Sequence, residues 1–248
     1  MTGLDGRHAI VTGGASGIGR AIAVAFAGAG ARVTVADRDA EAAASVAAEV
    51  GGESWVVDLD DTGELDALTL DADILVNNAG LQRIGPIDGY DPEAWRRIHR
   101  IMLEAPFLLI RAVMPSMYAR GWGRVINVSS VHGLRASAFK SAYVAAKHGL
   151  EGLSKVTALE GGPHGVTSNC INPAYVRTPL VEKQIADQAR THGIPEDQVV
   201  EQIMLTPVAV KRLVEPAEVA DLVTFLTGPS AASMSGSSYA MDGGWTAH

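Results

Sequence analysis

The chain of 248 residues is 47% hydrophobic, carries a formal net charge of −8 and contains one cysteine. The acidic balance excludes the basic face that nucleic-acid binding needs. Cys170 cannot form an internal disulfide, which favours a reducing cytoplasm. No charged leader is visible at the start, and the longest apolar stretch, 21–31, is too short to cross a bilayer. We therefore expect a cytoplasmic globular protein with no membrane or nucleic-acid partner.

Short β-like runs alternate with segments of helical periodicity. The expected strands are residues 8–13, 31–37, 54–59, 72–78, 123–130, 166–173 and 237–243, and the expected helices are about 17–29, 39–50, 92–119, 142–160 and 216–227. Several strands are continuous apolar runs, which is typical of a parallel sheet covered on both faces. The order predicts an α/β fold in which 1–248 form a single domain: a Rossmann-type, doubly wound, parallel seven-stranded sheet with helices on both faces.

The longest segment without a predicted strand or helix is 174–214, which is rich in charge and contains three prolines. Irregular loops of that length in a compact fold are usually functional. We expect a substrate lid within about 174–214.

A glycine-rich turn, "VTGGASGIGRAIA" (11–23), follows the first expected strand and opens the first expected helix. Gly13, Gly17 and Gly19 would permit a sharp turn and let a pyrophosphate approach backbone N–H groups at a helix N-terminus. A tight turn without a ligand is the alternative. The strand–turn–helix context favours a nucleotide site.

An acidic residue, Asp37, ends the second expected strand, eighteen residues after Gly19. A carboxylate at that place can accept hydrogen bonds from both adenosine ribose hydroxyls and would repel a 2′-phosphate. It favours NAD over NADP, although Arg38 could pair with a phosphate. A turn Asp at a strand end is the plainer alternative.

Tyr143 and Lys147 stand four positions apart and would share one face of the helix expected over 142–160. They could be two side chains of an ordinary amphipathic helix, or an acid and the cation that tunes it. Together with the glycine turn, "NNAG" (77–80) and "NVSS" (127–130), this pair makes the chain resemble the short-chain dehydrogenase/reductases over nearly its full length.

The resemblance implies a catalytic set of Ser130, Tyr143 and Lys147, and NAD as the cofactor. The cofactor-binding residues that it implies are Gly13, Ser16, Gly17, Ile18, Gly19, Asp37, Asp58, Leu59, Asn78, Ala79, Gly80, Tyr143, Lys147, Pro173, Val176 and Thr178. No metal site is expected.

Within that family the chain is most similar to the D-3-hydroxybutyrate dehydrogenases, in "HGLRASAFKSAYVAAKHG" (132–149), "YVRTPLVEKQI" (175–185) and "DGGWTAH" (242–248). The resemblance implies a substrate carboxylate held by Gln82, His132, Lys140 and Gln184. Trp245 would close on the apolar end of the substrate, and Tyr175 stands where that group has Trp.

Oxidation of a secondary alcohol needs a base for the hydroxyl proton and an acceptor for the hydride. A free tyrosine titrates near ~10, so we expect Lys147 and the positive nicotinamide to lower the pKa of Tyr143. The expected activity is the reversible oxidation of (R)-3-hydroxybutyrate to acetoacetate in a homotetramer. The alternatives are a dehydrogenase or reductase for a 3-oxoacyl thioester, a different hydroxy acid or a polyol, and a non-catalytic nucleotide-binding protein.

The family pattern is broken at residue 102, where Met102 replaces an Asn that supports a proton-carrying water. A thioether is a poor hydrogen-bond partner. Pro106 has no N–H to offer the carbonyl of residue 102, so we expect a helix kink with that carbonyl free to hold the water. The alternative is a simply packed Met102 with another proton path. Ala174 also departs from the pattern, where a Pro-Gly pair is common.

Overall fold

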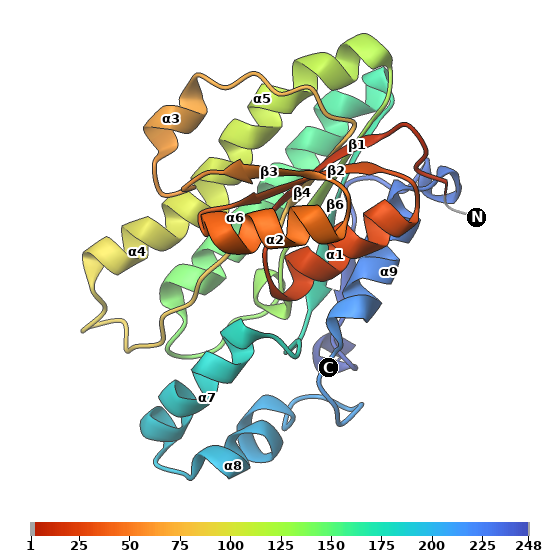
Figure 1. Ribbon diagram of the computed structural model, residues 1–248. Helices are drawn as coiled ribbons and strands as arrows, with labels where there is room; N and C mark the ends of the chain where they lie inside the picture. The colour runs from red at the N-terminus through yellow and green to blue at the C-terminus, as the bar shows by residue number, and fades with distance from the viewer. Residues whose placement is uncertain (1–2, 248) are drawn as a thin grey trace.

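The computed structural model describes residues 3–247 and contains one seven-stranded sheet in the order β3-β2-β1-β4-β5-β6-β7 (Figure 1). Every pairing in the sheet is parallel. The strands are β1 His8–Thr12, β2 Arg32–Asp37, β3 Glu53–Val56, β4 Ile74–Asn77, β5 Gly123–Val128, β6 Val166–Pro173 and β7 Ser238–Met241. The predicted doubly wound α/β fold is confirmed, with all seven strands at the expected places.

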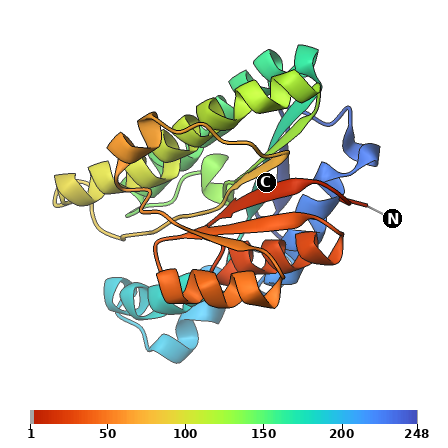
Figure 2. The same ribbon diagram turned by 45° about the horizontal axis from the view of Figure 1, so that its top comes forward.

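Helices cover both faces of the sheet, as Figure 2 shows. One layer contains α1 (Gly17–Gly28), α2 (Ala40–Glu49) and α9 (Pro216–Thr227). The other contains α3 (Thr62–Asp66), α4 (Pro92–His99), α5 (Ala105–Arg120) and α6 (Ser141–Gly161). Short 3₁₀ turns lie at Val131–Gly133, Gly162–His164, Pro229–Ala231 and Trp245–Ala247.

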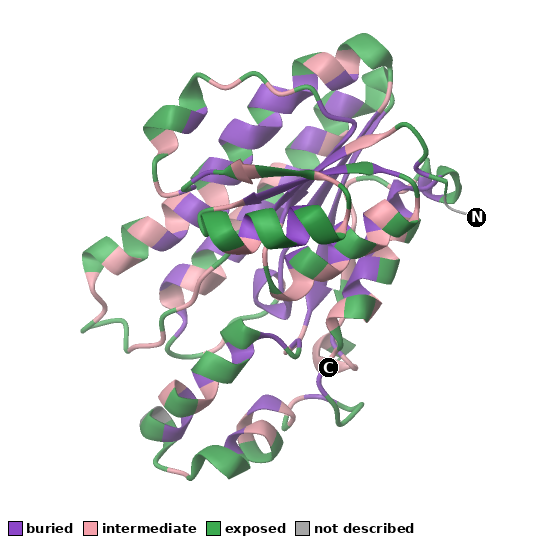
Figure 3. Cartoon of the chain, in the orientation of Figure 1, coloured by how far each residue is buried: buried purple, intermediate pink, exposed green. Residues whose placement is uncertain are grey.

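Alternate strand residues serve two separate hydrophobic cores. In β1, Val11 packs in the core under α1 and α9, whereas Ile10 packs in the core under α5 and α6. In β4, Val76 and Leu75 divide in the same way. Because successive side chains of a strand point to opposite faces, a sheet covered on both sides needs apolar residues at every position. This explains the continuous apolar runs, and Figure 3 shows the central strands buried.

The helix predicted over 92–119 is present but interrupted. Between α4 and α5, residues Arg100–Glu104 form a π-helical turn, in which the N–H of Ala105 bonds to the carbonyl of Arg100. The whole helix, Pro92–Arg120, is long and apolar enough to cross a membrane, but 61% of its apolar window is buried in the protein. It is a core helix that packs on the sheet and on α6.

The segment 174–214, expected to be irregular, is largely helical, so that expectation is wrong. It contains α7 (Pro179–His192), α8 (Glu196–Val199) and a π-helical turn at Val200–Met204. Pro179 is the first residue of α7, where its missing N–H costs nothing, and Thr178 caps the helix. Pro195 directly precedes the first residue of α8, so two of the three prolines lie at helix starts. The segment projects beyond the carboxyl ends of the strands (Figure 1).

Candidate active site

An open cavity of about 640 Å³ lies at the carboxyl ends of the strands. The strand order reverses between β1 and β4, and ligands of such sheets bind in the crevice at that point. Of the predicted site residues, all but Gly19 and Ser130 line this cavity. It runs from the glycine turn to Trp245, which is room for a dinucleotide and a small substrate.

The glycine turn is braced by the segment after β4. Gly13 has φ +61° and Gly17 has φ +52°, a region that other residues rarely adopt. The Asn78 amide donates to the carbonyls of Thr12 (2.9 Å) and Gly13 (3.2 Å). A Cβ on Gly13 would lie 2.9 Å from the Cα of Ala79. The turn therefore keeps backbone at the cavity wall, which fits the approach of a pyrophosphate.

Gly19 lies behind the turn and not on the cavity wall. A Cβ at this position would collide with the carbonyl of Gly13. Gly19 therefore permits close packing of α1 on the turn, and a direct contact with a ligand stays a prediction.

Asp37 lies beside the turn at the end of β2. Its carboxylate accepts from the backbone N–H of Ala15 and of Asp39, each at 3.1 Å. It therefore ties β2 to the glycine turn and presents negative charge to the cavity. The positive side chain of Arg38 lines the same cavity.

The remaining predicted cofactor residues come from the start of α7 and from four other segments. Thr178 packs against Gly17, since a Cβ there would lie 3.2 Å from its methyl group. The start of α7 therefore rests on the glycine turn. The others line the cavity from α1, from the end of β3, from the "NNAG" segment and from the end of β6: Ser16, Ile18, Asp58, Leu59, Ala79, Gly80, Pro173 and Val176.

Ser130, Tyr143 and His132 lie close together, and Tyr143 and His132 line the cavity. The His132 ring meets the Tyr143 ring edge-on at 5.9 Å, and its Nδ1 lies 3.4 Å from Ser130 Oγ. Burial raises the pKa of Tyr143, while a hydrogen bond with Ser130 lowers it. Burial, with the nearby Lys140 charge, lowers the pKa of His132 to about 3, so this histidine is neutral.

Lys147 lies close to Tyr143 on the same helix. Its Nζ donates to the carbonyl of Val128 at 2.6 Å and lies 5.7 Å from the Tyr143 ring centroid. Burial raises the pKa of Tyr143 and lowers the pKa of Lys147 to about 8. That Lys147 and a bound positive nicotinamide together lower the pKa of Tyr143 stays a prediction.

Glu151 is a buried group that the sequence analysis missed. It lies one turn after Lys147 on α6, and its carboxylate accepts from Asn172 Nδ2 (2.6 Å) and Ser238 Oγ (2.5 Å). The same Asn172 amide donates to the carbonyl of Ser130 at 2.9 Å. Glu151 therefore joins α6 to β6 and β7 next to Ser130. The spacing 143, 147, 151 was the signal that could have found it.

Lys140 is directed into the cavity by an unusual backbone. Phe139 has φ +67°, a strained conformation for a residue with a side chain, and its carbonyl accepts from Gly85 N–H at 2.9 Å. Lys140 is 4% exposed, and burial lowers its pKa to about 8. Its Nζ donates to Tyr175 Oη at 3.0 Å.

The rings of Tyr175, Trp245 and His132 lie close together in the cavity wall. Tyr175 stacks on Trp245 with centroids 5.9 Å apart, and His132 meets Trp245 edge-on at 5.5 Å. His132 Nε2 also lies 3.0 Å from Ser137 Oγ. Trp245 therefore contacts two of the other predicted substrate residues, although it comes from the far end of the chain.

Two glutamine amides in this region have buried polar atoms without a partner among the described residues: Nε2 of Gln82 and Oε1 of Gln184. Buried polar atoms are nearly always hydrogen-bonded, so unpartnered ones at a cavity point to a ligand. Which amide atom is the donor is an assignment, and a flipped Gln184 would present its N–H₂. The four predicted carboxylate-holding residues line the same cavity.

Met102 is buried, and its side chain packs on Gly80, where a Cβ would lie 3.5 Å from the methionine Cε. The helix irregularity expected next to Pro106 is present as the π-helical turn Arg100–Glu104. That the carbonyl of residue 102 is free and holds a water stays a prediction.

Comparisons with known proteins agree with this site. A family model described as short chain dehydrogenase matches residues 7–189. The chain is 46% identical to the D-beta-hydroxybutyrate dehydrogenase of Rhizobium meliloti, over 97% of this chain and 99% of that protein. It is 43% identical to the D-beta-hydroxybutyrate dehydrogenase of Cupriavidus necator, over 98% and 99%. A crystal structure of a putative 2-deoxy-D-gluconate 3-dehydrogenase from Agrobacterium tumefaciens with bound NADP has a TM-score of 0.87 and 32% identity, covering 100% of this chain and 99% of that one.

The family match covers the glycine turn, the "NNAG" segment and the Ser130, Tyr143 and Lys147 set. Tyr143, Lys147, most of residues 13–19 in the glycine turn and most of "NNAG" line the cavity described above, and Ser130 lies beside Tyr143. The chain therefore belongs to the short-chain dehydrogenase family, as an oxidoreductase that uses a nicotinamide cofactor.

Proposed function

We propose that the protein catalyses the reversible, NAD-dependent oxidation of (R)-3-hydroxybutyrate to acetoacetate. The observation that carries the proposal is the meeting of two groups of residues in one cavity. Tyr143 and Ser130 can act on a hydroxyl, while buried Lys140 and two unpartnered glutamine amides can hold an anion. The relatives named for D-beta-hydroxybutyrate support the same substrate.

The reaction uses Tyr143 as the base that removes the proton from the substrate hydroxyl. Bound nicotinamide supplies the hydride acceptor. Before substrate binds, the hydrogen bond with Ser130 lowers the pKa of Tyr143. When substrate is bound, the single hydroxyl proton of Ser130 is donated to the substrate oxygen and orients it for proton transfer to Tyr143. Lys147 lies in the cavity wall near Tyr143, and its positive charge favours the ionised form of Tyr143.

The carboxylate end of the substrate lies against Lys140, Gln82 and Gln184 in this proposal. Lys140 supplies attraction in a buried place, where a charge interaction is stronger than in water. His132 is neutral and therefore acts as a hydrogen-bond partner without adding charge. An analogue without the carboxylate would leave these groups unpaired and would be rejected strongly. Trp245 covers the apolar end.

The preference for NAD rests on Asp37. Its carboxylate lies at the turn, tied to Ala15 N–H and Asp39 N–H, where a 2′-phosphate would meet negative charge. Arg38 at the same cavity edge is the residue that could offset this repulsion.

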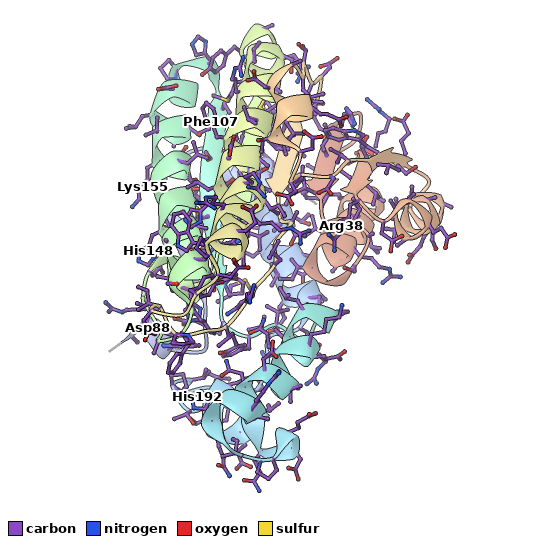
Figure 4. All side chains as sticks on the ribbon, turned by 90° about the vertical axis from the view of Figure 1, so that its left-hand side faces the viewer. Arg38, Asp88, Phe107, His148, Lys155 and His192 are labelled. Carbon is purple, nitrogen blue, oxygen red and sulfur yellow. The ribbon has the colours of Figure 1, made fainter. Side chains whose placement is uncertain are left out.

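We also propose that the protein is a cytoplasmic homotetramer. In support, α5 and α6 present exposed apolar side chains on one face: Phe107 is 48% exposed, Val156 51% and Leu159 79%. Figure 4 looks onto this face, with Phe107 on α5 and His148 and Lys155 on α6. Apolar patches of this kind are typical of subunit contacts.

The test is an absorbance assay for NADH with both enantiomers of 3-hydroxybutyrate, other 3-hydroxy acids, a polyol and a 3-oxoacyl thioester, with NAD and NADP. We expect the R acid with NAD to be the best pair. Robust turnover of an uncharged alcohol without turnover of the R acid would overturn the substrate, and better rates with NADP would overturn the cofactor. No turnover with any substrate would favour a non-catalytic nucleotide-binding protein.

A further inference from the structure

Tyr175 occupies a position between the cationic and the aromatic parts of the cavity. Its hydroxyl oxygen accepts a hydrogen bond from Lys140 Nζ at 3.0 Å, and its ring stacks on Trp245. Both residues of the Lys140–Tyr175 pair line the cavity that contains Tyr143. The pair is fixed by two elements, since Lys140 precedes α6 and Tyr175 follows β6.

The hydrogen-bond inventory of this pair leaves one donor free. A lysine ammonium can only donate, so Tyr175 Oη must be the acceptor in the bond with Lys140. The single hydroxyl proton of Tyr175 therefore points away from Lys140. Among the described residues, no protein acceptor takes it, and the ring lies in the cavity wall. A donor without a protein acceptor in the wall of a ligand cavity is placed to meet an acceptor on the ligand.

We propose that the Tyr175 hydroxyl is a further donor to the carboxylate of the substrate and makes the site selective for anionic substrates. The inference rests on the proposed function, because it places the carboxylate beside Lys140. The ammonium polarises the phenol, so Tyr175 donates a charge-assisted hydrogen bond that a neutral substrate end cannot use as well.

Two features of the surroundings support this role. Burial raises the pKa of Tyr175 to about 12, so the hydroxyl keeps its proton over the working range. Gln82 Nε2 is a buried atom without a partner among the described residues, in the same cavity. Lys140, Gln82 and Tyr175 together then offer one charge and three donor groups, which a carboxylate with about four acceptor sites can satisfy.

The experiment compares wild type with Tyr175→Phe, which removes the hydroxyl oxygen and keeps the ring on Trp245. The substrates are (R)-3-hydroxybutyrate and its neutral amide of the same size. We expect the KM for the acid to rise about tenfold, with kcat within about twofold, and the KM for the amide to change less than about twofold. Tyr118→Phe is the matched control, since Tyr118 stacks on His164 away from the cavity and should change nothing.

An equal change of both KM values, or no change of either, would overturn the proposal, because ring packing alone would then explain Tyr175. Melting temperatures accompany the kinetics. If Tyr175→Phe melts more than about 5 °C lower, Tyr175→Met replaces it, since methionine fills a similar space without a donor.

A calorimetric titration of acetate into the protein with NADH separates this inference from the proposed function. We expect wild type to bind acetate and Tyr175→Phe to bind it about tenfold more weakly. If wild type binds acetate through Tyr175 but does not oxidise the R acid, the proposed function fails alone. If wild type oxidises the R acid and Tyr175→Phe binds acetate equally well, the inference fails alone.

Discussion

Lys147 and Glu151 lie one turn apart on the buried side of α6, and the carboxylate of Glu151 opposes the fall in the pKa of Lys147 that burial causes. They form no direct ion pair. Glu151 is held instead by Asn172 and Ser238, which belong to β6 and β7. The sheet therefore fixes a negative charge at a set distance from the lysine.

Glu151→Gln should lower the pKa of Lys147 further, because it removes the charge and keeps the hydrogen-bonding shape. The loss of activity at high pH, where Lys147 becomes neutral, should then begin about one pH unit lower, equivalent to ~1.4 kcal/mol. The measurement is the pH profile of kcat between pH 6 and 10. Glu160→Gln, an exposed residue on the same helix, is the control. An unshifted profile with a lower melting temperature would mean that Glu151 only joins elements.

Lys140→Met should raise the KM for the R acid by roughly 10- to 100-fold, the loss expected for a charge-assisted hydrogen bond. The rate with a neutral secondary alcohol should stay within about twofold. Lys211→Met is a matched control, since Lys211 is exposed, does not line the cavity and bonds to the carbonyls of Leu205 and Thr206. Equal losses for acid and alcohol would show that Lys140 does not read the carboxylate.

The pH dependence of substrate binding follows from the same lysine. Its pKa is lowered to about 8, so Lys140 is charged below that pH and neutral above it. The KM for the R acid should therefore rise as the pH increases through 8, and this rise should be absent in Lys140→Met. A titration of KM against pH for both proteins checks the sign. A wild-type KM that is constant to pH 9.5 would contradict it.

His132 should make the protein sensitive to acid. Its pKa is lowered to about 3 in the folded state, while an unfolded histidine titrates near ~6.5. Between these values the unfolded state binds more protons, so the free energy of unfolding falls as the pH drops below 6.5. At pH 5 the loss is roughly 2 kcal/mol. Urea unfolding at pH 7 and pH 5 should show a smaller loss for His132→Gln, whereas exposed His192→Gln should behave as wild type.

Most of the fold could be predicted because its sequence signals are local. The strand positions follow from continuous apolar runs such as "ILVN" in β4, which is buried at every residue. The segment 174–214 was expected to be irregular, but it contains two helices, and Pro179 and Pro195 lie within it. Both lie at or just before helix starts, where a proline is tolerated. Whether a proline breaks a helix or begins one depends on the residue that caps the helix, which for α7 is Thr178.

The site was predicted less completely, because two of its features depend on burial. Burial raises the pKa of Tyr143, an effect that the four-residue spacing to Lys147 does not reveal. Glu151 was missed because a glutamate on a helix is normally solvated, and only the sheet beneath α6 gives it Asn172 and Ser238 as donors. Spacing shows which residues share a face, but not how much water reaches them.

The π-helical turn next to Pro106 gives the last prediction. Pro106 cannot donate to the carbonyl of Met102, and the helix is π-helical over Arg100–Glu104 directly before it. If the carbonyl of Met102 holds the water that carries protons away from Lys147, the side chain of residue 102 matters little. Met102→Asn should then leave kcat within about twofold.

Pro106→Ala restores an N–H that can bond to the carbonyl of Met102 and straighten the helix. We expect kcat to fall roughly tenfold, less than the ~10²–10⁴-fold of a complete general acid–base step because other routes to solvent remain. Pro115→Ala is the matched control, since Pro115 lies in the interior of α5, away from the π-helical turn. The opposite result would be a kcat about tenfold higher in Met102→Asn and unchanged in Pro106→Ala. It would mean that the carbonyl of Met102 does not hold the proton-carrying water and that the thioether of Met102 limits proton transfer from Lys147.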